Sequence, residues 1–345
     1  MSCQSCPASA AMKAFSGLRP CCSAASQGGE QPCQSAEDPN LGKILDGRYV
    51  LCECLQPGLR GTIYRARSLN TPKQFAIKII PPGPRGPTAI DFPHSVRNPH
   101  LLDVFDIFTF DDDHVAVVMP LIQGETLAKR VRRLGPLDLA TTVVLARQIA
   151  SALLSLHLRG VVHGDLHPGN IVLETLPSGE LFCHLLNASW GRTPSPSVTL
   201  EDPEDPFFFI SPEEVGSSTA TAASDVYSFG ALLYFMLTAT SPFFETHRLR
   251  ATEAILRGLR ADSLRGLNGL LPRPLKRLMF SLLQRDPSLR PGPVQEIIAA
   301  LDNLEVPATA PAGHSISCGE TIHRPTPLAA ILWHRGERPH GLERA

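Results

Sequence analysis

The residues best suited to chemistry lie in the middle of the chain, in the segment His163–Asn170. Within this segment Asp165 is followed, five residues later, by Asn170. A carboxylate can accept the proton of an attacking hydroxyl group, and an amide oxygen can hold a metal ion beside it. The segment therefore predicts a loop that carries a general base and a metal ligand, a pair suited to phosphoryl transfer.

A lysine inside an apolar strand is the second candidate. Lys78 lies within Gln74–Ile80, where a charged side chain is costly unless it meets an anion. A turn with Gly58 and Gly61 precedes this strand, and glycines allow backbone N–H groups to approach phosphate oxygens. Together these features predict a phosphate-binding surface, although an ordinary turn and an edge-strand lysine would explain each of them separately.

Hydrophobic periodicity predicts strands up to about residue 122 and helices beyond it. The expected strands are Tyr49–Leu55, Thr62–Arg67, Gln74–Ile80, Leu101–Phe110 and His114–Ile122. The expected helices are Leu139–Leu158, Ala223–Thr238, Ala251–Leu259, Leu275–Arg285 and Val294–Leu304. The proline-rich stretch Pro81–Pro99 is expected to hold no long regular helix.

These elements divide the chain into four segments. We expect a flexible arm rich in Cys, Ser and Gln over residues 1–45 and a Pro- and His-rich tail over residues 305–345. Between them, residues 46–122 would form a small β-rich lobe with a hinge, and residues 123–304 a larger helical lobe. The predicted fold class is therefore α+β with two lobes.

The composition narrows the class of protein further. Of 345 residues, 43% are apolar and 19% are charged, which is enough for a packed core. Lys and Arg number 32 and Asp and Glu 33, so the balance gives no attraction to nucleic acid or to an anionic membrane. The apolar stretch Phe229–Phe244 is interrupted and too short to span a bilayer, and the N-terminus lacks the pattern of a secretory signal. We expect a cytoplasmic protein with no membrane span and no nucleic-acid partner.

Five of the nine cysteines lie in the first 33 residues. Their odd number does not indicate a disulfide framework. Cys3 and Cys6 have the spacing that begins a zinc ribbon, but the adjacent pair Cys21 and Cys22 stands where a second such pair would be needed. A zinc site, a lipidated or redox-sensitive tail, and a mobile tail without a cysteine function all remain open.

Several motifs follow one another in a fixed order: the glycine turn, Lys78 in its strand, His163–Asn170, Ser211–Glu213, Ser224–Gly230 and Arg290–Pro291. From about residue 49 to residue 304 the chain resembles the eukaryotic-type Ser/Thr protein kinase family. Its sequence is most similar in character to the bacterial members of that family. The resemblance implies the bilobal protein kinase fold, ATP as cofactor, and a protein substrate or protein partners. It leaves their identity and the oligomeric state open.

The resemblance also implies roles for individual residues. Lys78 would contact the α- and β-phosphates of ATP, Asp165 would be the catalytic base, and Asn170 would hold Mg²⁺ or Mn²⁺. The nucleotide would lie against Gly58, Gly61, Ile63, Ala76, Met119, Pro120 and Ile122.

Three further residues would support the helical lobe. Glu213 and Arg290 would form a buried ion pair, and Asp225 would brace the loop of Asp165. In the hinge, Pro120 has no N–H but retains a carbonyl for the adenine amine, and the N–H of Ile122 could bind the ring.

The chain departs from the family where metal is bound. The metal-binding D-F-G motif aligns with Asn187–Ser189, so a neutral amide replaces the carboxylate that would hold Mg²⁺. The acidic partner expected for Lys78 is missing too, because Asp91 is the sole acidic residue between Lys78 and His100. Smaller departures are Gln56, Gly164, His167 and Pro206 at positions where the family has glycine, arginine, lysine and threonine.

These departures favour a pseudokinase, a kinase-like signalling protein with room for ATP, with little or no phosphoryl transfer and with a scaffold or regulatory role. Asn187 would be a degenerate metal ligand, which puts Mg²⁺ or Mn²⁺ binding in doubt. One alternative is a divergent active Ser/Thr kinase, with metal binding rescued by Mn²⁺ or by an acid of Glu201–Asp205. A minor alternative is a small-molecule phosphotransferase, because the sequence His163–Asn170 also resembles the corresponding loop of that family.

Overall fold

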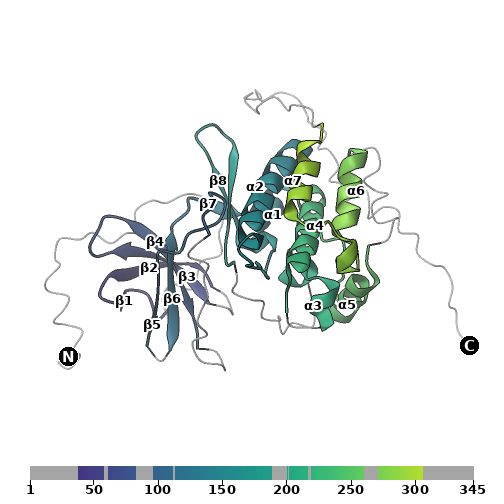
Figure 1. Ribbon diagram of the computed structural model, residues 1–345. Helices are drawn as coiled ribbons and strands as arrows, with labels where there is room; N and C mark the ends of the chain where they lie inside the picture. The colour runs from purple at the N-terminus through teal and green to yellow at the C-terminus, as the bar shows by residue number, and fades with distance from the viewer. Residues whose placement is uncertain are drawn as a thin grey trace, which may run out of the picture.

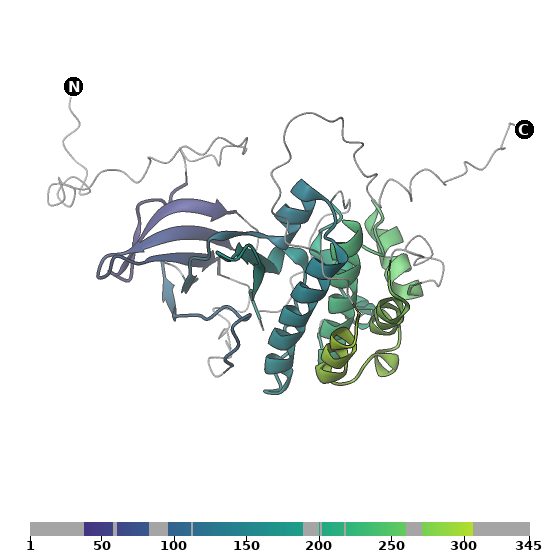
Figure 2. The ribbon, with the colours of Figure 1, turned by 90° about the horizontal axis from the view of Figure 1, so that it is seen from above.

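The computed structural model describes residues 38–57, 61–82, 96–111, 113–188, 200, 202–216, 219–259 and 271–305. They form one lobe of strands and one mainly of helices, which lie next to each other in both ribbon views (Figures 1 and 2). The predicted bilobal α+β fold is confirmed. Gly58, residues 1–37 of the predicted arm and residues 306–345 of the predicted tail lie outside the described residues.

The strand lobe contains one six-stranded antiparallel sheet with the order β1-β2-β3-β4-β6-β5. Its strands are β1 (Ile44–Leu45), β2 (Tyr49–Gln56), β3 (Thr62–Ser68), β4 (Gln74–Ile80), β5 (Asp106–Phe110) and β6 (His114–Pro120). Two expected boundaries are corrected. Strand β1 lies within residues 1–45, so the sheet begins inside the segment predicted to be a flexible arm. Strand β5 begins at Asp106 rather than Leu101, because Leu101 instead bridges Leu185 of the other lobe.

The alternation of side chains along β4 determines where Lys78 points. Successive residues of a strand face opposite sides of the sheet. Ile77 and Ile79 pack into the core beneath one side, whereas Ala76 packs on the other side with Met119 of β6. Lys78 alternates with these isoleucines and therefore lies on the side of Ala76. Leu186 of the helical lobe packs against that same cluster, so this side of the sheet faces the helical lobe.

The helical lobe is built around buried helices and one small sheet of order β7-β8-β9. Its strands are β7 (Gly124–Thr126), β8 (Ile171–Thr175) and β9 (Leu181–Leu185). Its helices are α1 (Leu127–Leu134), α2 (Leu139–His157), α3 (Pro212–Gly216), α4 (Ala222–Thr238), α5 (Arg248–Arg257), α6 (Arg273–Leu282) and α7 (Val294–Asp302), with short 3₁₀ turns at Pro168–Asn170, Pro206–Phe209 and Pro287–Leu289. The five expected helices are all present within a few residues of their predicted ends.

Local sequence signals begin the two long helices. Asp138 precedes α2, and its carboxylate accepts a hydrogen bond of 2.8 Å from the N–H of Thr141. Thr221 and Ser224 form a reciprocal capping box at the start of α4. Helix α4 is buried along nearly its whole length between α2 and α6 (Figure 1), which explains its almost continuous apolar sequence.

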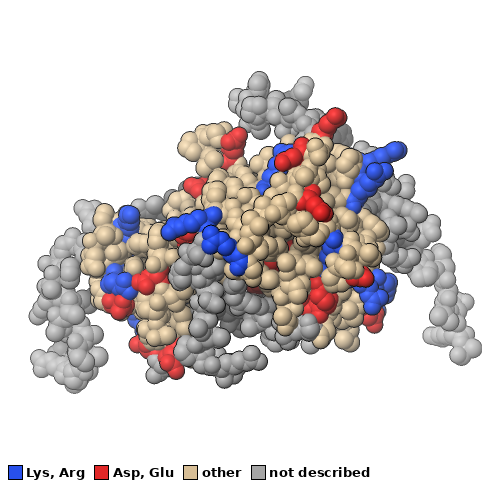
Figure 3. Space-filling model, viewed as in Figure 1, with Lys and Arg blue, Asp and Glu red and all other residues tan. Residues whose placement is uncertain are grey.

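Within the described part of the chain, α2 is the helix whose length and apolar composition would allow it to cross a membrane. Its most apolar window is 50% buried inside the protein, and α2 packs against α4, α7 and β9. Packing in the lobe accounts for its apolar side chains, so its composition is not by itself a sign of a membrane. On the face shown in Figure 3, basic and acidic side chains are interspersed over both lobes.

Candidate active site

A buried aspartate of α4 holds the loop that carries Asp165. Asp225 is 1% exposed and accepts hydrogen bonds from the backbone N–H groups of His163 (2.8 Å) and Gly164 (2.9 Å). Its Oδ2 also accepts a hydrogen bond of 2.8 Å from Nε2 of His157, at the end of α2. The expected brace is therefore present. Gly164 has a φ of 72°, in the left-handed region that favours glycine, so glycine adopts this backbone conformation without strain.

His163 connects the same loop to the segment that follows β9. Its Nε2 donates to the carbonyl of Leu186 (2.9 Å), and its Nδ1 accepts a hydrogen bond of 3.2 Å from the N–H of Asp165. These two bonds require the neutral imidazole with the proton on Nε2. The sequence reasoning did not predict this role of His163, nor that of His157. For His157 the available signal was its place at the end of a mainly apolar helix.

Four side chains form a continuous chain of hydrogen bonds, which we call the amide relay. Nζ of Lys78 donates to Oδ1 of Asn187 (3.3 Å), and Nδ2 of Asn187 donates to Oδ1 of Asn170 (2.7 Å). Nδ2 of Asn170 then donates to Oδ2 of Asp165 (3.1 Å) and to its backbone carbonyl (2.7 Å). Lysine only donates and a carboxylate only accepts, so the two ends determine the orientation of both amides. The relay brings together Lys78, Asp165, Asn170 and Asn187, all four of which had been singled out from the sequence.

The backbone around Asn187 supports this arrangement. Asn187 has a φ of 61°, a conformation that asparagine and aspartate adopt more readily than most residues. The preceding N–H, of Leu186, donates 2.8 Å to the carbonyl of Asn170. Asn187 is therefore held beside Asn170 by the main chain as well as by its side chain. Ser189, the last residue of the aligned motif, lies outside the described residues.

The described residues do not fit a magnesium site. Mg²⁺ requires oxygen ligands in a near-octahedral arrangement and is usually held by one or two carboxylates together with substrate phosphates. Asp165 is the sole carboxylate of the amide relay, and the Oδ1 atoms of Asn170 and Asn187 already accept hydrogen bonds from within it. In the described ranges no group of three or more His, Cys, Asp or Glu residues could hold a metal ion. The hydrogen bonds of Asn187 therefore add to the argument against Mg²⁺ binding that its residue type already gave.

The acidic segment before α3 does not supply the missing ligand from its described residues. Glu204 and Asp202 pair with Arg132 of α1, the latter at 3.8 Å. Asp205 accepts a hydrogen bond of 2.8 Å from the N–H of Phe207 and so begins the turn that contains Pro206. The carboxylates of this segment are therefore engaged elsewhere in the helical lobe. Glu201 lies outside the described residues.

The apolar residues predicted to contact a nucleobase lie together. Ile63, Ala76, Met119 and Ile122 belong to one cluster on the side of the sheet that faces the helical lobe. Ala76 of β4 is paired directly with Met119 of β6, so two of the residues expected to contact the nucleotide are neighbours in the sheet. In the part of the chain that the structure describes, the N–H of Ile122 is not used in a backbone hydrogen bond. The group fits a flat, apolar ring with one acceptor atom.

Gly61 has a structural reason to be glycine. A Cβ at this position would lie 2.4 Å from the carbonyl oxygen of Ile79, and the φ of 122° disfavours other residues. Gly61 therefore permits β3 to begin close against β4, one residue from Lys78. Its predicted contact with phosphate remains a prediction.

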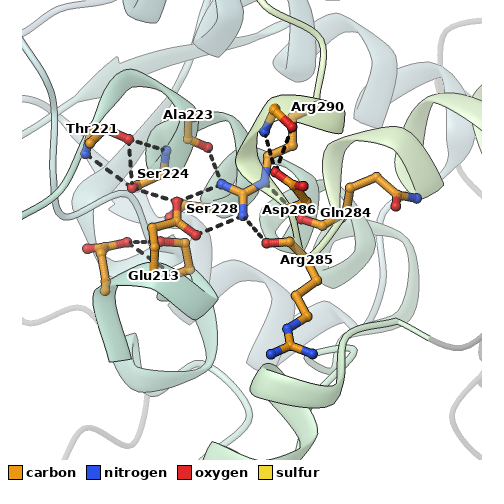
Figure 4. A network of polar contacts seen from close by, with 12 residues as sticks. Glu213, Thr221, Ala223, Ser224, Ser228, Gln284, Arg285, Asp286 and Arg290 are labelled. Carbon is orange, nitrogen blue, oxygen red and sulfur yellow. Dashed lines mark hydrogen bonds and ion pairs between the residues drawn. The ribbon is translucent and has the colours of Figure 1, made fainter. Parts of the chain in front are cut away.

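The ion pair expected in the helical lobe is present (Figure 4), and the side chain of Arg290 is fully buried whereas that of Glu213 is 23% exposed. Nη1 and Nη2 of Arg290 lie 2.7 Å and 2.8 Å from the two carboxylate oxygens of Glu213, a bidentate arrangement. The remaining donors of Arg290 reach the backbone carbonyls of Ala223, Gln284 and Arg285. Burial raises the pKa of Glu213, but the hydrogen bonds from Arg290, from a backbone N–H and from Ser224, together with the charge of Arg290, outweigh this effect and leave that pKa below its ordinary value. The pair joins α3 to the segment before α7.

The fold and the site together define the class of protein. The family model described as "Protein kinase domain" matches residues 49–300. The chain therefore belongs to the protein kinase family.

Individual relatives agree with this family. The chain is 30% identical over 274 residues to the serine/threonine-protein kinase PkaA of Streptomyces coelicolor, which covers 72% of this chain and 48% of that protein. It is 31% identical over 256 residues to the human serine/threonine-protein kinase ULK3, with 71% and 52% covered. The chain thus spans about half of the length of these relatives or less. Among solved structures, Rad53 1-466 in complex with AMP-PNP aligns with a TM-score of 0.59 at 23% identity, covering 72% of this chain and 62% of that one, which supports the fold.

Proposed function

We propose that this chain is a kinase-fold signalling protein of the pseudokinase type. It binds a nucleotide between its lobes, transfers phosphate poorly or not at all, and acts by contacting protein partners as a scaffold or regulator. A cytoplasmic location is part of the proposal and rests on the composition of the chain.

The observation that carries the proposal is the state of Asn187. By the sequence resemblance, the residue replaces the metal-binding carboxylate of the family, and both polar atoms of its side chain are engaged by Lys78 and Asn170. Phosphoryl transfer depends almost entirely on positioning and on neutralisation of the phosphate charge. Loss of one such electrostatic contact costs about 10²–10³ in rate, so a site without this carboxylate is poorly equipped for transfer.

A divergent active Ser/Thr kinase is the second candidate, and one observation favours it. Asp165 and Lys78 lie in the same site, where they are 3% and 7% exposed. The loop of Asp165 is held by hydrogen bonds to Asp225. The comparisons, which identify a protein kinase domain, give no support to a small-molecule phosphotransferase.

Phosphate incorporation distinguishes the two candidates. Wild-type protein and the Asp165→Asn variant are incubated with ATP and either Mg²⁺ or Mn²⁺, and phosphate on the protein and on a basic protein substrate is measured by mass spectrometry. The proposal expects equal, background incorporation by both proteins. Incorporation by the wild type that disappears in the variant would establish an active kinase.

A further inference from the structure

A short segment, residues 98–102, attaches the strand lobe to the helical lobe. Leu101 packs into the core of the helical lobe, whereas Leu102 belongs to the apolar cluster of the sheet. The N–H of Leu102 donates to the carbonyl of Leu185 in β9 (3.0 Å), and the N–H of Leu185 donates to the carbonyl of His100 (2.8 Å). We call this attachment of residues 98–102 to β9 the lobe joint.

Asn98 fixes the lobe joint to helix α2 as well. Its Nδ2 donates to the hydroxyl of Ser155 (2.8 Å) and to the backbone carbonyl of Ser151 (3.1 Å). Its Oδ1 accepts a hydrogen bond of 2.9 Å from the N–H of His100. The position of His100 is therefore set from both α2 and β9.

His100 is the titratable side chain of the lobe joint. Its Nδ1 lies 3.1 Å from the carbonyl oxygen of Cys183 and carries a proton, because a carbonyl only accepts. The half-buried ring contacts the ring of Phe182 with 4.4 Å between centroids. Phe182 also contacts His184 at 5.1 Å, and Nε2 of His184 lies 3.0 Å from Glu174. A second proton on His100 would therefore enter at Nε2, in a half-buried place near another histidine.

We propose that the lobe joint is a pH-sensitive contact, in which protonation of His100 in mildly acidic solution favours release of residues 98–102 from β9. Release exposes the imidazolium to water, whereas the closed joint holds the ring against Phe182 and near His184. The strand lobe is then held less firmly on the helical lobe at acid pH. This inference goes beyond the proposed function and does not depend on nucleotide binding or phosphate transfer.

The pKa of His100 agrees in direction with this geometry. Burial lowers that pKa below its ordinary value of 6.5, the hydrogen bond to the Cys183 carbonyl opposes the effect of burial, and the charge of His184 adds to it. Because the folded-state pKa is lowered, the closed joint binds fewer protons than the open joint. The contribution of His100 to the joint is complete above the open-state pKa and is lost as the pH falls through the folded-state pKa.

The other titratable groups around His100 do not reverse this direction. Burial raises the pKa of the Cys183 thiol, so this group remains uncharged. Glu174 of β8 is engaged with the neighbouring histidine, and the exposed pair of Arg97 and Asp103 is joined at 3.6 Å. Helix α2 contributes hydroxyl groups and a carbonyl to the joint, which carry no charge. Among the described residues, no carboxylate pairs with the ring of His100.

Hydrogen exchange measures the lobe joint directly, because the N–H groups of Leu102 and Leu185 bond across it. Protection of these two amides in the full chain is measured at about pH 7.5 and about pH 5.5, within the range where histidine changes charge. Protection is corrected for the intrinsic pH dependence of exchange and is expressed relative to the amide of Leu153 in the buried core of α2.

A matched pair of variants isolates the titrating ring. His100→Asn cannot take up a proton in this range but retains a donor for the carbonyl of Cys183. The control is His114→Asn, because Nδ1 of His114 also lies near a backbone carbonyl, that of Asp111 (2.7 Å), and its ring also contacts an aromatic ring, that of Phe110 (5.7 Å). His114 lies at the turn between β5 and β6 and bonds to that turn rather than to the lobe joint.

For the wild type and His114→Asn, we expect the relative protection of Leu102 and Leu185 to fall about threefold or more from the higher to the lower pH. For His100→Asn, we expect a change of less than about 1.5-fold, whatever the strength of its joint at the higher pH. Unchanged relative protection in the wild type would overturn the inference, and this result does not depend on whether any variant folds. The full wild-type fall in His100→Asn would overturn it as well.

Discussion

Nζ of Lys78 and Oδ1 of Asn187 lie 3.3 Å apart, and this hydrogen bond joins residues separated by 109 positions in the sequence. It connects the strand lobe to the helical lobe at the position that the sequence resemblance assigns to the metal-binding carboxylate of the family. An amide accepts the hydrogen bond without neutralising the ammonium, whereas a carboxylate would do both. With asparagine instead of a carboxylate at position 187, the described site lacks one negative charge beside Lys78.

The first prediction concerns the ion pair of Glu213 and Arg290. Changing Glu213 to Gln leaves the fully buried side chain of Arg290 without a counter-charge, so we expect the free energy of unfolding to fall by about 3 kcal/mol. Urea unfolding followed by circular dichroism measures this loss. Lys43→Gln, which breaks the exposed pair with Asp111, is the control and should cost less than about 1 kcal/mol. Equal losses of unfolding free energy in the two variants would show that the pair of Glu213 and Arg290 stabilises the protein no more than an exposed pair does.

The same carboxylate predicts a pH dependence of stability. The pKa of Glu213 in the folded protein lies below its ordinary value of 4.5. A lowered pKa contributes stability that is complete above the unfolded-state value and is lost as the pH falls through the folded-state pKa. We therefore expect the unfolding temperature of the wild type to drop below about pH 4.5 more steeply than that of Glu213→Gln. If the unfolding temperatures of the two proteins fell equally steeply as the pH was lowered, this assignment would be contradicted.

The third prediction concerns the brace beneath the loop of Asp165. An Asp225→Asn variant keeps one acceptor oxygen but turns an amide NH₂ toward a backbone N–H, either of His163 or of Gly164. We expect a loss of about 1–3 kcal/mol in stability. Hydrogen exchange at these two amides should accelerate more than in the core of α2. Unchanged exchange at both amides would show that the loop does not need the brace.

The fourth prediction separates the close approach at Gly61 from its backbone conformation. A Gly61→Ala change places a Cβ 2.4 Å from the Ile79 carbonyl in a backbone of positive φ, so we expect a loss of about 1–3 kcal/mol or more. Gly160→Ala is the matched control, because Gly160 also has positive φ but has open space around it. The control should lose about 1 kcal/mol, the cost of the left-handed backbone alone. Both losses are read from denaturant unfolding, and equal losses would exclude a steric role for Gly61.

The sequence predicted those features that depend on local pattern. The long helices follow from their apolar runs, and Asp165, Asn170 and Lys78 stand out by residue type and spacing. The short strands β1 and β7–β9 escaped prediction, since each is only a few residues long and is stabilised by pairing with a neighbour. For this reason the predicted end of the flexible arm at residue 45 is wrong, because β1 lies before it.

The amide relay lies beyond prediction from pattern alone. The identity of Asn187 showed that a charge was missing, but not where its two polar atoms would point. That orientation depends on Lys78 at one end and Asp165 at the other, which the fold brings together from both lobes. The roles of His157 and His163 escaped for the same reason, because each depends on a partner distant in sequence.

The most direct test of the central claim is the rate of phosphate transfer from ATP by the wild type relative to Asp165→Asn, in Mg²⁺ and in Mn²⁺. A pseudokinase whose Asn187 leaves no place for the metal should show the same background rate as this variant with either ion. Transfer by the wild type that requires Asp165 would contradict the account and would show that the site recruits a metal despite Asn187.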